Sequence, residues 1–184
     1  YNPYNRFPLK QIAPTERDDL FRKELLRGFV HDEGAALLGG VSGNAGLFGT
    51  ANDLAKIMQF YLQKGEYGGF RFLNVETIND FTSVQFPDNH NRRGLGFDKP
   101  YLDNKFRSSN DAYPAPGVSP ESFGHSGYTG VFTWVDPSNQ LLFIFLTNRV
   151  YPTRENTKLI DSNFRPRLLQ SIISCQHTFE PEAY

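Results

Sequence analysis

The sequence predicts an α/β (α+β) fold in which an antiparallel sheet is flanked by helices. Three patterns predict it. Apolar residues recur at helical spacing over residues 54–62. Two apolar runs, 129–135 and 141–147, are separated by turn-forming residues and should form a hairpin. An apolar stripe over residues 164–173 predicts a final helix. With 184 residues, 39% of them hydrophobic, the chain can bury one core, and we expect a single domain over residues 1–184.

The first third of the chain carries weak signals. Residues 1–20 should be irregular, because their three prolines prevent a continuous helix. Residues 21–29 could form either a short helix or a strand. Residues 31–50 hold six glycines, which implies tight backbone approach or positive φ angles. We expect that stretch to run as a buried loop system between elements.

The helical part covers residues 50–82. Residues 50–53 fit a capping box for the first helix, and Gly65 suits the position just after its end. A turn and a short strand should follow. Asn74 can then cap a second helix that runs to about residue 82.

The sheet strands should lie within residues 122–148. Residues 122–126 read as a strand before the hairpin. The last strand, 141–147, is apolar on both faces and should therefore be central. A further strand is possible at 93–97, whereas residues 102–119 should be loop.

The C-terminal helix is predicted over residues 162–175, after a polar connection at 150–163. Pro166 is tolerated in the first turn of such a helix. The tail from Gln176 should be frayed.

Composition excludes several classes of function. The net charge is −1 and no run of Lys or Arg offers a nucleic-acid surface. The longest apolar run, residues 141–146, is too short to span a bilayer. The only cysteine, Cys175, can form neither an intrachain disulfide nor a cysteine-based metal site. The start at Tyr1, without an initiator Met or signal peptide, suggests a trimmed piece of a longer protein.

The most informative motif is Gly-His-Ser-Gly-Tyr-Thr-Gly at residues 124–130. Glycine weakens strands, so two glycines beside a histidine and a serine indicate that another molecule's backbone lies close. A histidine next to a small hydroxyl suits a substrate carboxylate or a proton relay. The alternative is a strand edge with a structural histidine and a glycine bend.

At this motif the chain resembles a known family. His125-Ser126-Gly127 looks like the Lys-Thr-Gly box of serine β-lactamases and penicillin-binding proteins, some of which have His in place of Lys. The order of motif, hairpin and C-terminal helix also matches. The resemblance covers roughly residues 10–175 and is of the class C β-lactamase or esterase type. Further segments that resemble the family are residues 30–34, 38–50, 53–55, 123–136 and 146–152.

The resemblance implies roles for six residues. His125 would polarise the site and help a proton relay, and Ser126 would hydrogen-bond the carboxylate or carbonyl of the substrate. Gly127 would permit close approach, and the backbone N–H of Tyr128 would be one oxyanion-hole donor. Asn148 and Arg149 resemble polar residues of the family that approach the anionic end of a substrate. A capped, solvated strand end is an equal alternative for these two residues.

The resemblance also shows what this chain lacks. No serine is followed three residues later by lysine, and no Tyr-x-Asn box occurs. Acyl transfer needs an activated nucleophile, so the chain alone should be inactive. The fold should be incomplete on its N-terminal side, and the exposed apolar face should favour the missing portion of the same domain, a homodimer or strand exchange.

Two classes of function follow from the resemblance. The parent would be a serine hydrolase that acts through an acyl-serine on a β-lactam, a cell-wall D-alanyl peptide or a small ester, and His in the box favours an esterase or peptidase. The alternative is a non-catalytic cell-wall-binding or structural module attached to a glycoside hydrolase. Either would be periplasmic or secreted, and neither needs a cofactor.

Two other patterns invite weaker interpretations. The glycine-rich residues 40–46 lack the Lys-Ser/Thr of a phosphate-binding loop, and Asn44 stands where family members often have His, which puts a role for that position in doubt. Residues 31–33, His-Asp-Glu, could be a metal fragment, but three adjacent residues on an extended chain cannot all face one ion. No metal site is therefore predicted. Trp134 should be core.

Overall fold

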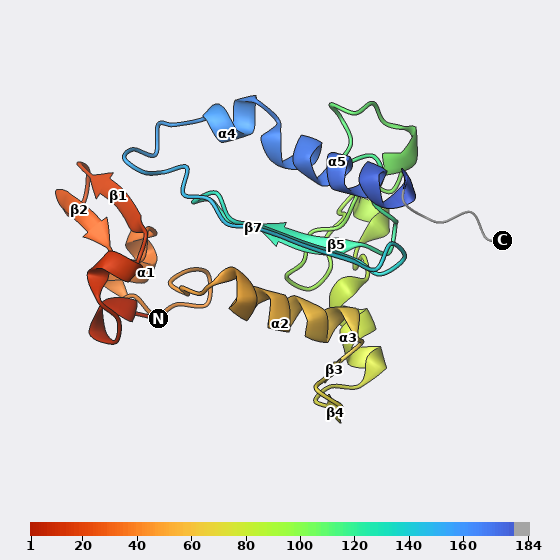
Figure 1. Cartoon of the computed structure of the whole chain (residues 1–184), viewed down its shortest axis with the longest axis horizontal. Helices are drawn as coiled ribbons and strands as arrows, with labels where there is room; N and C mark the ends of the chain where they lie inside the picture. Colours follow the sequence, from red (N-terminus) through yellow and green to blue (C-terminus); the bar gives the residue numbers. More distant parts are fainter. Residues whose placement is uncertain (179–184) are drawn as a thin grey trace. The chain divides into compact units, whose positions relative to one another are not determined.

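The computed structural model describes residues 1–178, which form two compact units (Figure 1). Unit 1 consists of Tyr1–Thr50, Gly127–Val131 and Leu146–Asp161. Among the described residues, unit 2 consists of Ala51–Ser126, Phe132–Phe145 and residues 162–178. Each unit is assembled from segments that are distant in sequence. The expectation of a single domain stays a prediction.

The N-terminal hairpin of unit 1 corrects the expectation that residues 1–20 are irregular. Strand β1, Pro14–Asp18, pairs antiparallel with β2, Glu24–Arg27. Proline can begin a strand, because the ladder bond that it cannot donate is dispensable there. The Asp18 carboxylate accepts hydrogen bonds from the backbone N–H groups of the turn, which closes the hairpin. The ambiguous residues 21–29 thus contain a strand. Before the hairpin, two 3-10 helices cover Pro3–Asn5 and Leu9–Gln11.

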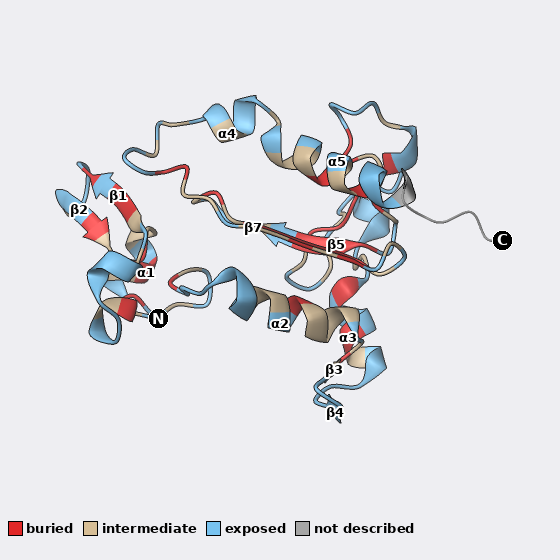
Figure 2. Cartoon of the chain, viewed as in Figure 1, coloured by how far each residue is buried: buried red, intermediate tan, exposed pale blue. Residues whose placement is uncertain are grey.

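Residues 31–50 also differ from expectation. They contain a helix, α1, Glu33–Leu37, whose first turn is capped by Asp32 through a 2.7 Å bond from the Ala35 N–H to Oδ1. Most of the stretch is exposed rather than buried, including the side chains of Leu37 and Leu47 (Figure 2). The predicted buried loop system is therefore wrong. Helix α4, Lys158–Asp161, is a further element of unit 1, within the stretch predicted as a polar connection.

The sheet of unit 2 is antiparallel, as predicted. Its strands are β5, Phe123–Ser126, β6, Phe132–Asp136, and β7, Leu141–Phe145, in the order β5-β6-β7. The hairpin of β6 and β7 is confirmed. The prediction that the last strand is central is wrong, since β6 is the middle strand and β7 an edge strand of the described chain. Strand β7 is apolar on both faces because both faces of the sheet are covered by helices.

Those two helices make unit 2 a three-layer structure (Figures 1 and 2). On one face, Leu169 and Ile173 of α5, Phe164–Thr178, pack against Trp134 and its neighbours. On the other face, Met58 of α2, Ala51–Leu62, packs with Phe123 and Val135. Both helices begin close to where the apolar spacing predicts them. Helix α5 continues to Thr178, and the rest of the tail predicted to fray lies outside the described residues.

The remaining elements of unit 2 follow α2. Strands β3, Glu66–Tyr67, and β4, Phe70–Arg71, form a two-residue hairpin, whose turn glycines both have positive φ. Gly65, predicted to follow the end of the first helix, also has positive φ. Helix α3, Val75–Thr82, has Asn74 at its N-cap, although the asparagine side chain makes no capping bond.

Residues 83–121 are mostly loop. They contain 3-10 helices at Pro87–Asn89 and Asn104–Phe106. The strand considered at 93–97 does not form. Instead, the next residue, Asp98, makes an isolated antiparallel bridge with Gly124 of β5. Within residues 1–178, no helix is both long and apolar enough to cross a membrane.

Candidate functional site

Strand β5 places His125 and Ser126 at the end of the sheet of unit 2. One edge of β5 pairs with β6, where His125 lies opposite Thr133. At the other edge, Asp98 exchanges two backbone hydrogen bonds with Gly124, of 2.7 and 3.0 Å. The strand is thus held on both sides next to His125. The imidazole itself is 52% exposed, so it is open to a reactant rather than sealed in the core.

Gly124 and Gly127 of the motif differ in how closely their surroundings pack against them. A Cβ at Gly124 would lie 2.4 Å from Cε3 of Trp134 and 2.1 Å from the Thr133 carbonyl oxygen, so this glycine is required by packing inside the sheet. The expectation that it admits another molecule is not needed to explain it. A Cβ at Gly127 would meet only Val131, at an ordinary 3.5 Å. Gly127 therefore leaves space that the packing of unit 1 does not use.

The Asp98 side chain makes several polar contacts beside β5. Its side chain is 3% exposed. Oδ2 accepts a 2.8 Å hydrogen bond from the Tyr113 hydroxyl and lies 3.9 Å from Nδ1 of His125. On the other oxygen, Oδ1, Nη1 of Arg93 is 3.0 Å away and Nη1 of Arg92 is 3.5 Å away. A buried carboxylate with two guanidinium groups beside it keeps its charge balanced.

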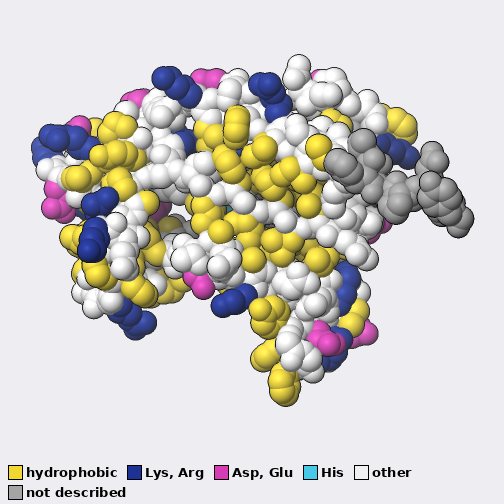
Figure 3. Space-filling view, viewed as in Figure 1, with side chains coloured by type: hydrophobic (Ala, Val, Ile, Leu, Met, Phe, Trp, Pro, Cys, Tyr) yellow, Lys and Arg dark blue, Asp and Glu magenta, His cyan; other side chains and the backbone are white. Residues whose placement is uncertain are grey.

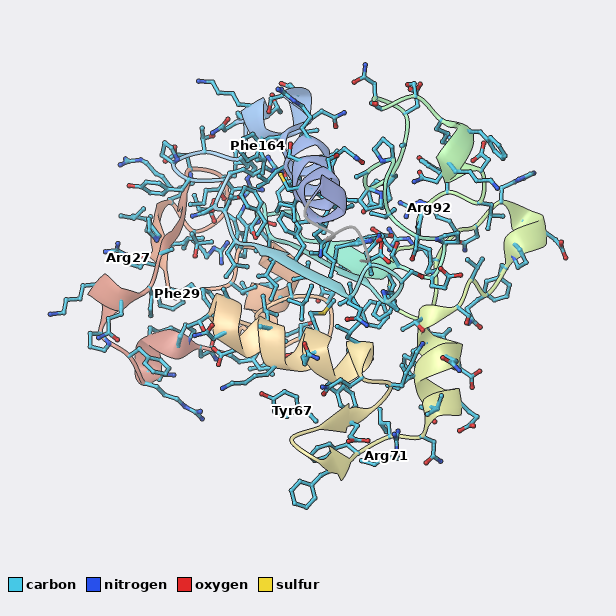
Figure 4. All side chains as sticks on the ribbon, turned by 45° about the vertical axis from the view of Figure 1, so that its right-hand side comes forward. Arg27, Phe29, Tyr67, Arg71, Arg92 and Phe164 are labelled. Carbon is cyan, nitrogen blue, oxygen red and sulfur yellow. The ribbon has the colours of Figure 1, made fainter. Side chains whose placement is uncertain are left out.

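Tyr113 is a partner of Asp98 that also lies near the second residue of the motif. Its hydroxyl donates to Asp98, and the Ser126 side chain is close enough to act on its pKa, in the lowering direction. Burial, together with the negative charge of Asp98, raises the pKa of Tyr113 to about 12, so the hydroxyl stays protonated and able to donate. The guanidinium of Arg92 stacks 4.0 Å from the centroid of the Tyr113 ring (Arg92 is labelled in Figure 4).

The next residue after Asp98 is a buried lysine at the opposite end of β5. Nζ of Lys99 donates to the carbonyl oxygen of Glu121 at 2.9 Å. Burial lowers the pKa of Lys99 to about 8. Since its ammonium is bound beside the start of the strand, we assign it to the structure of unit 2.

The motif continues into unit 1 with Gly127 and Tyr128. The Tyr128 side chain is exposed, and within residues 1–178 no acceptor is recorded for its backbone N–H. Its carbonyl oxygen accepts a 2.8 Å bond from Nε of Arg149, whose guanidinium lies 4.4 Å from the centroid of the Tyr128 ring. The backbone N–H is thus available, as an oxyanion-hole donor has to be.

Asn148 and Arg149 bind other parts of unit 1. Arg149 is buried, and its Nη1 donates to the carbonyl oxygens of Arg154 and Asn156, both at 3.1 Å. Nδ2 of Asn148 donates to the carbonyl oxygens of Pro14 and Thr15. These contacts tie both side chains to unit 1, but the burial of Arg149 differs from the solvated strand end considered as the alternative. The substrate-binding assignment of the two residues stays a prediction.

The residues of the His-Asp-Glu segment turn to different partners. Asp32 caps α1, Nε2 of His31 lies 3.0 Å from Oε2 of Glu16, and Glu33 pairs with Arg154 at 2.8 Å. Within the described residues, no group of three or more His, Cys, Asp or Glu is placed to hold a metal ion. The segment supports unit 1 instead of forming a metal fragment.

Unit 2 therefore brings together two of the predicted residues and two that the motif does not reveal. His125 and Ser126 lie beside the Asp98–Tyr113 pair, which sequence reasoning missed. Asp98 follows the segment that was considered as a strand, and Tyr113 lies in a predicted loop. No local sequence pattern marks these two residues, because their contacts with the motif join positions that are far apart in the sequence. A surface pocket of unit 2 contains none of the predicted site residues, and its lining residues are Asn52, Ala55, Lys56, Gln59, Tyr67 and Leu142.

Comparison with known proteins gives a consistent result. The sequence profile of the Beta-lactamase family matches residues 6–164. A protein of Salmonella gallinarum named putative D-alanyl-D-alanine carboxypeptidase is 35% identical over 183 residues, which cover 92% of this chain. A protein of the same name from Escherichia coli is 34% identical over 186 residues, which cover 90% of the chain. The chain spans about 40% of the length of each of these relatives.

Proposed function

Because this chain belongs to the beta-lactamase family, we propose that it is the C-terminal part of a serine hydrolase that acts on D-alanyl peptides. The family match and the names of the relatives support this substrate class. The observation that carries the proposal is the half-exposed imidazole of His125, at the end of a strand that is fixed on both edges. A small ester is the second substrate class that the same chemistry accepts. We propose a periplasmic or secreted location, where such peptides occur.

The reaction would proceed in two steps. A serine outside this chain attacks the peptide carbonyl, the terminal D-alanine leaves as an amine, and water then releases the acyl group. His125 would move the proton that the leaving amine requires. Ser126 would hydrogen-bond the substrate carboxylate. The backbone N–H of Tyr128 would donate to the oxyanion, an interaction that typically contributes on the order of 10²- to 10³-fold in kcat.

The test compares the full-length parent with the 184-residue chain. We expect the parent to become labelled by a fluorescent penicillin and to release D-alanine from a peptide that ends in D-alanyl-D-alanine. The chain alone should do neither. His125→Gln in the parent should lower the rate of D-alanine release by on the order of 10²- to 10⁴-fold. A folded parent that is never acylated, and that releases D-alanine no faster than buffer does, would refute the hydrolase.

The lack of a Ser-x-x-Lys segment in the chain keeps one alternative in view. A non-catalytic module that binds the cell wall would retain purified peptidoglycan without cleaving it. Its binding should then be unchanged by His125→Gln. This result, together with an unlabelled parent, would favour the module.

The edge of the sheet offers a place for the rest of the protein. Strand β7 has a neighbour on one side only in the described chain, and Phe145 next to this edge is only partly buried. Hydrophobic side chains gather at the surface around this part of unit 2 (Figure 3). We propose that a further strand of the parent pairs with β7. The amide protons of β7 should then exchange more slowly in the parent than in the chain alone, whereas a chain that is protected only as a dimer would support self-association.

A further inference from the structure

Strand β5 carries an exposed imidazole directly beside a buried carboxylate. Asp98 lies in a loop, yet its backbone is bonded in both directions to Gly124, the residue before His125. This bridge sets the carboxylate at a fixed place along the strand. As a result, Oδ2 of Asp98 faces the Nδ1 edge of the ring at 3.9 Å, while the side chain of His125 stays half exposed.

We propose that Asp98 is the positioning residue of His125: it holds the ring with a proton on Nδ1 and leaves Nε2 free to exchange the proton of the reaction. The inference rests on the proposed function in one respect, that His125 acts in proton transfer. The two ring nitrogens differ, and the bond made by one decides the protonation of the other. A carboxylate at Nδ1 can only accept, so it selects the form with Nε2 unprotonated.

The Asp98 carboxylate can accept further hydrogen bonds. Its Oδ1 is buried and has no hydrogen bond of good geometry among the described residues, although Nη1 of Arg93 lies 3.0 Å away. Oδ2 has one donor, Tyr113. The distance of 3.9 Å exceeds that of a hydrogen bond. Contacts of catalytic groups are often long in the free protein and shorten when the substrate binds.

The surroundings of Asp98 hold the carboxylate in place. Tyr113 donates to Oδ2 and is itself held between the guanidinium of Arg92 and the ring of Trp134, whose centroid lies 5.8 Å from that of Tyr113. Arg92 also donates to the carbonyl oxygen of Lys99 at 2.6 Å.

The substitution Asp98→Asn tests the proton on Nδ1. The amide oxygen should face the arginines, since an amide N–H group there would meet guanidinium donors. The NH₂ group then replaces Oδ2 and points at Tyr113 and His125. It can donate to Nδ1 and cannot accept from it, so the ring should change to the form protonated on Nε2. Such a reversal in a catalytic triad lowers kcat by about 10⁴-fold.

The measurement is a ¹⁵N NMR spectrum of the imidazoles of the 184-residue chain at a pH where the rings are neutral. His125→Gln identifies the His125 signals. We expect the wild-type ring to show a protonated Nδ1 and an unprotonated Nε2, and Asp98→Asn to exchange the two assignments. Tyr113→Phe keeps the carboxylate and should keep the wild-type form. Asp103→Asn removes an exposed carboxylate of the same unit and should change neither signal.

The outcomes separate this inference from the proposed function. A wild-type ring that is protonated on Nε2 would overturn the inference, even if Asp98→Asn fails to fold. An unchanged tautomer in a folded Asp98→Asn chain would do the same. If the NMR result is as expected but the parent releases no D-alanine, the proposed function fails and the contact stands. In an active parent, Asp98→Asn should lower kcat by on the order of 10²- to 10⁴-fold with little change in KM.

Discussion

Replacing Arg154 with methionine should loosen unit 1 by removing a cation from a buried network. The guanidinium binds the Glu16 carboxylate with two bonds, Nε to Oε1 at 2.9 Å and Nη2 to Oε2 at 2.8 Å. The Glu16 side chain is 2% exposed. A third contact reaches Glu33 at 2.8 Å, but that carboxylate is 36% exposed and adds little.

The magnitude follows from the two buried bonds. Each hydrogen bond to a charged group contributes about 1.5–3 kcal/mol, so the pair together gives about 3–6 kcal/mol. Removing one partner of a buried ion pair independently suggests about 3–5 kcal/mol. The backbone N–H of Arg154 still donates to Oε1 in the variant, at 3.0 Å in the present structure. We therefore expect the lower range, about 3–5 kcal/mol.

The assay is amide hydrogen exchange of peptides that cover β1 and β2. The expected destabilisation corresponds to about 10²- to 5 × 10³-fold less protection. Peptides from β6 and β7 serve as the internal reference from unit 2. Arg17→Met is the matched control, because Arg17 is on the same strand as Glu16 and its pair with Asp19 is more than 70% exposed on both sides. Protection of β1 and β2 within about threefold of wild type would refute the reasoning.

Three further predictions concern acid, the motif glycines and the core. Unit 1 should lose stability as the pH falls: burial lowers the pKa of His31, so the unfolded state binds the extra proton first, below about pH 6.5. A second loss of stability begins below about pH 4.5. Burial alone would raise the pKa of Glu16, but the hydrogen bonds from Arg154 outweigh it and lower that pKa, so the unfolded state binds this proton first as well. Hydrogen exchange of β1 and β2, measured against pH, tests both losses. Gly124→Ala should destabilise unit 2 by about 1–3 kcal/mol or more, since its Cβ would meet the Trp134 ring, whereas Gly127→Ala should change stability by less than about 0.5 kcal/mol. Leu169→Ala should cost about 2–5 kcal/mol, because the side chain is fully buried. Fluorescence of Trp134 in urea measures the two variants of unit 2, and hydrogen exchange of β1 and β2 measures Gly127→Ala in unit 1.

The layers of unit 2 could be predicted because their signals are local. Helix α2 and the hairpin of β6 and β7 each join residues that are close in sequence, so spacing and turn residues suffice. The prediction that Trp134 is core is confirmed: Trp134 packs under α5, and its neighbour Val135 packs under α2. What spacing could not decide is the place of β7 in the sheet. A strand covered by helices on both faces is apolar on both, whether it lies at the edge or in the centre.

Unit 1 was harder to predict because its order comes from contacts at long range. Strand β1 lies within residues 1–20, whose three prolines predict irregular structure, and β2 lies within residues 21–29, whose pattern fits either a helix or a strand. Glu16 of β1 binds Arg154 across 138 positions of sequence, and nothing near either residue marks the pair. Burying a charged side chain is costly unless it is paired, so Glu16, with no partner nearby in the sequence, argues against a buried strand at β1. Asp32 and Glu33 were likewise considered as metal ligands, when one caps a helix and the other binds an arginine.

The same distinction explains what was found and what was missed at the candidate site. A reactive group has to be exposed, and the residues next to it on a strand shape its access, so the motif at 124–130 is compact in sequence and can be recognised there. The group that orients the imidazole has to approach it from the side, and on a strand paired with β6 this means from the opposite edge. Asp98 reaches that edge from a loop, through two backbone bonds that any residue except proline could make. Its carboxylate is therefore the part of the site that only the folded chain reveals, and the tautomer of His125 is the property that depends on it.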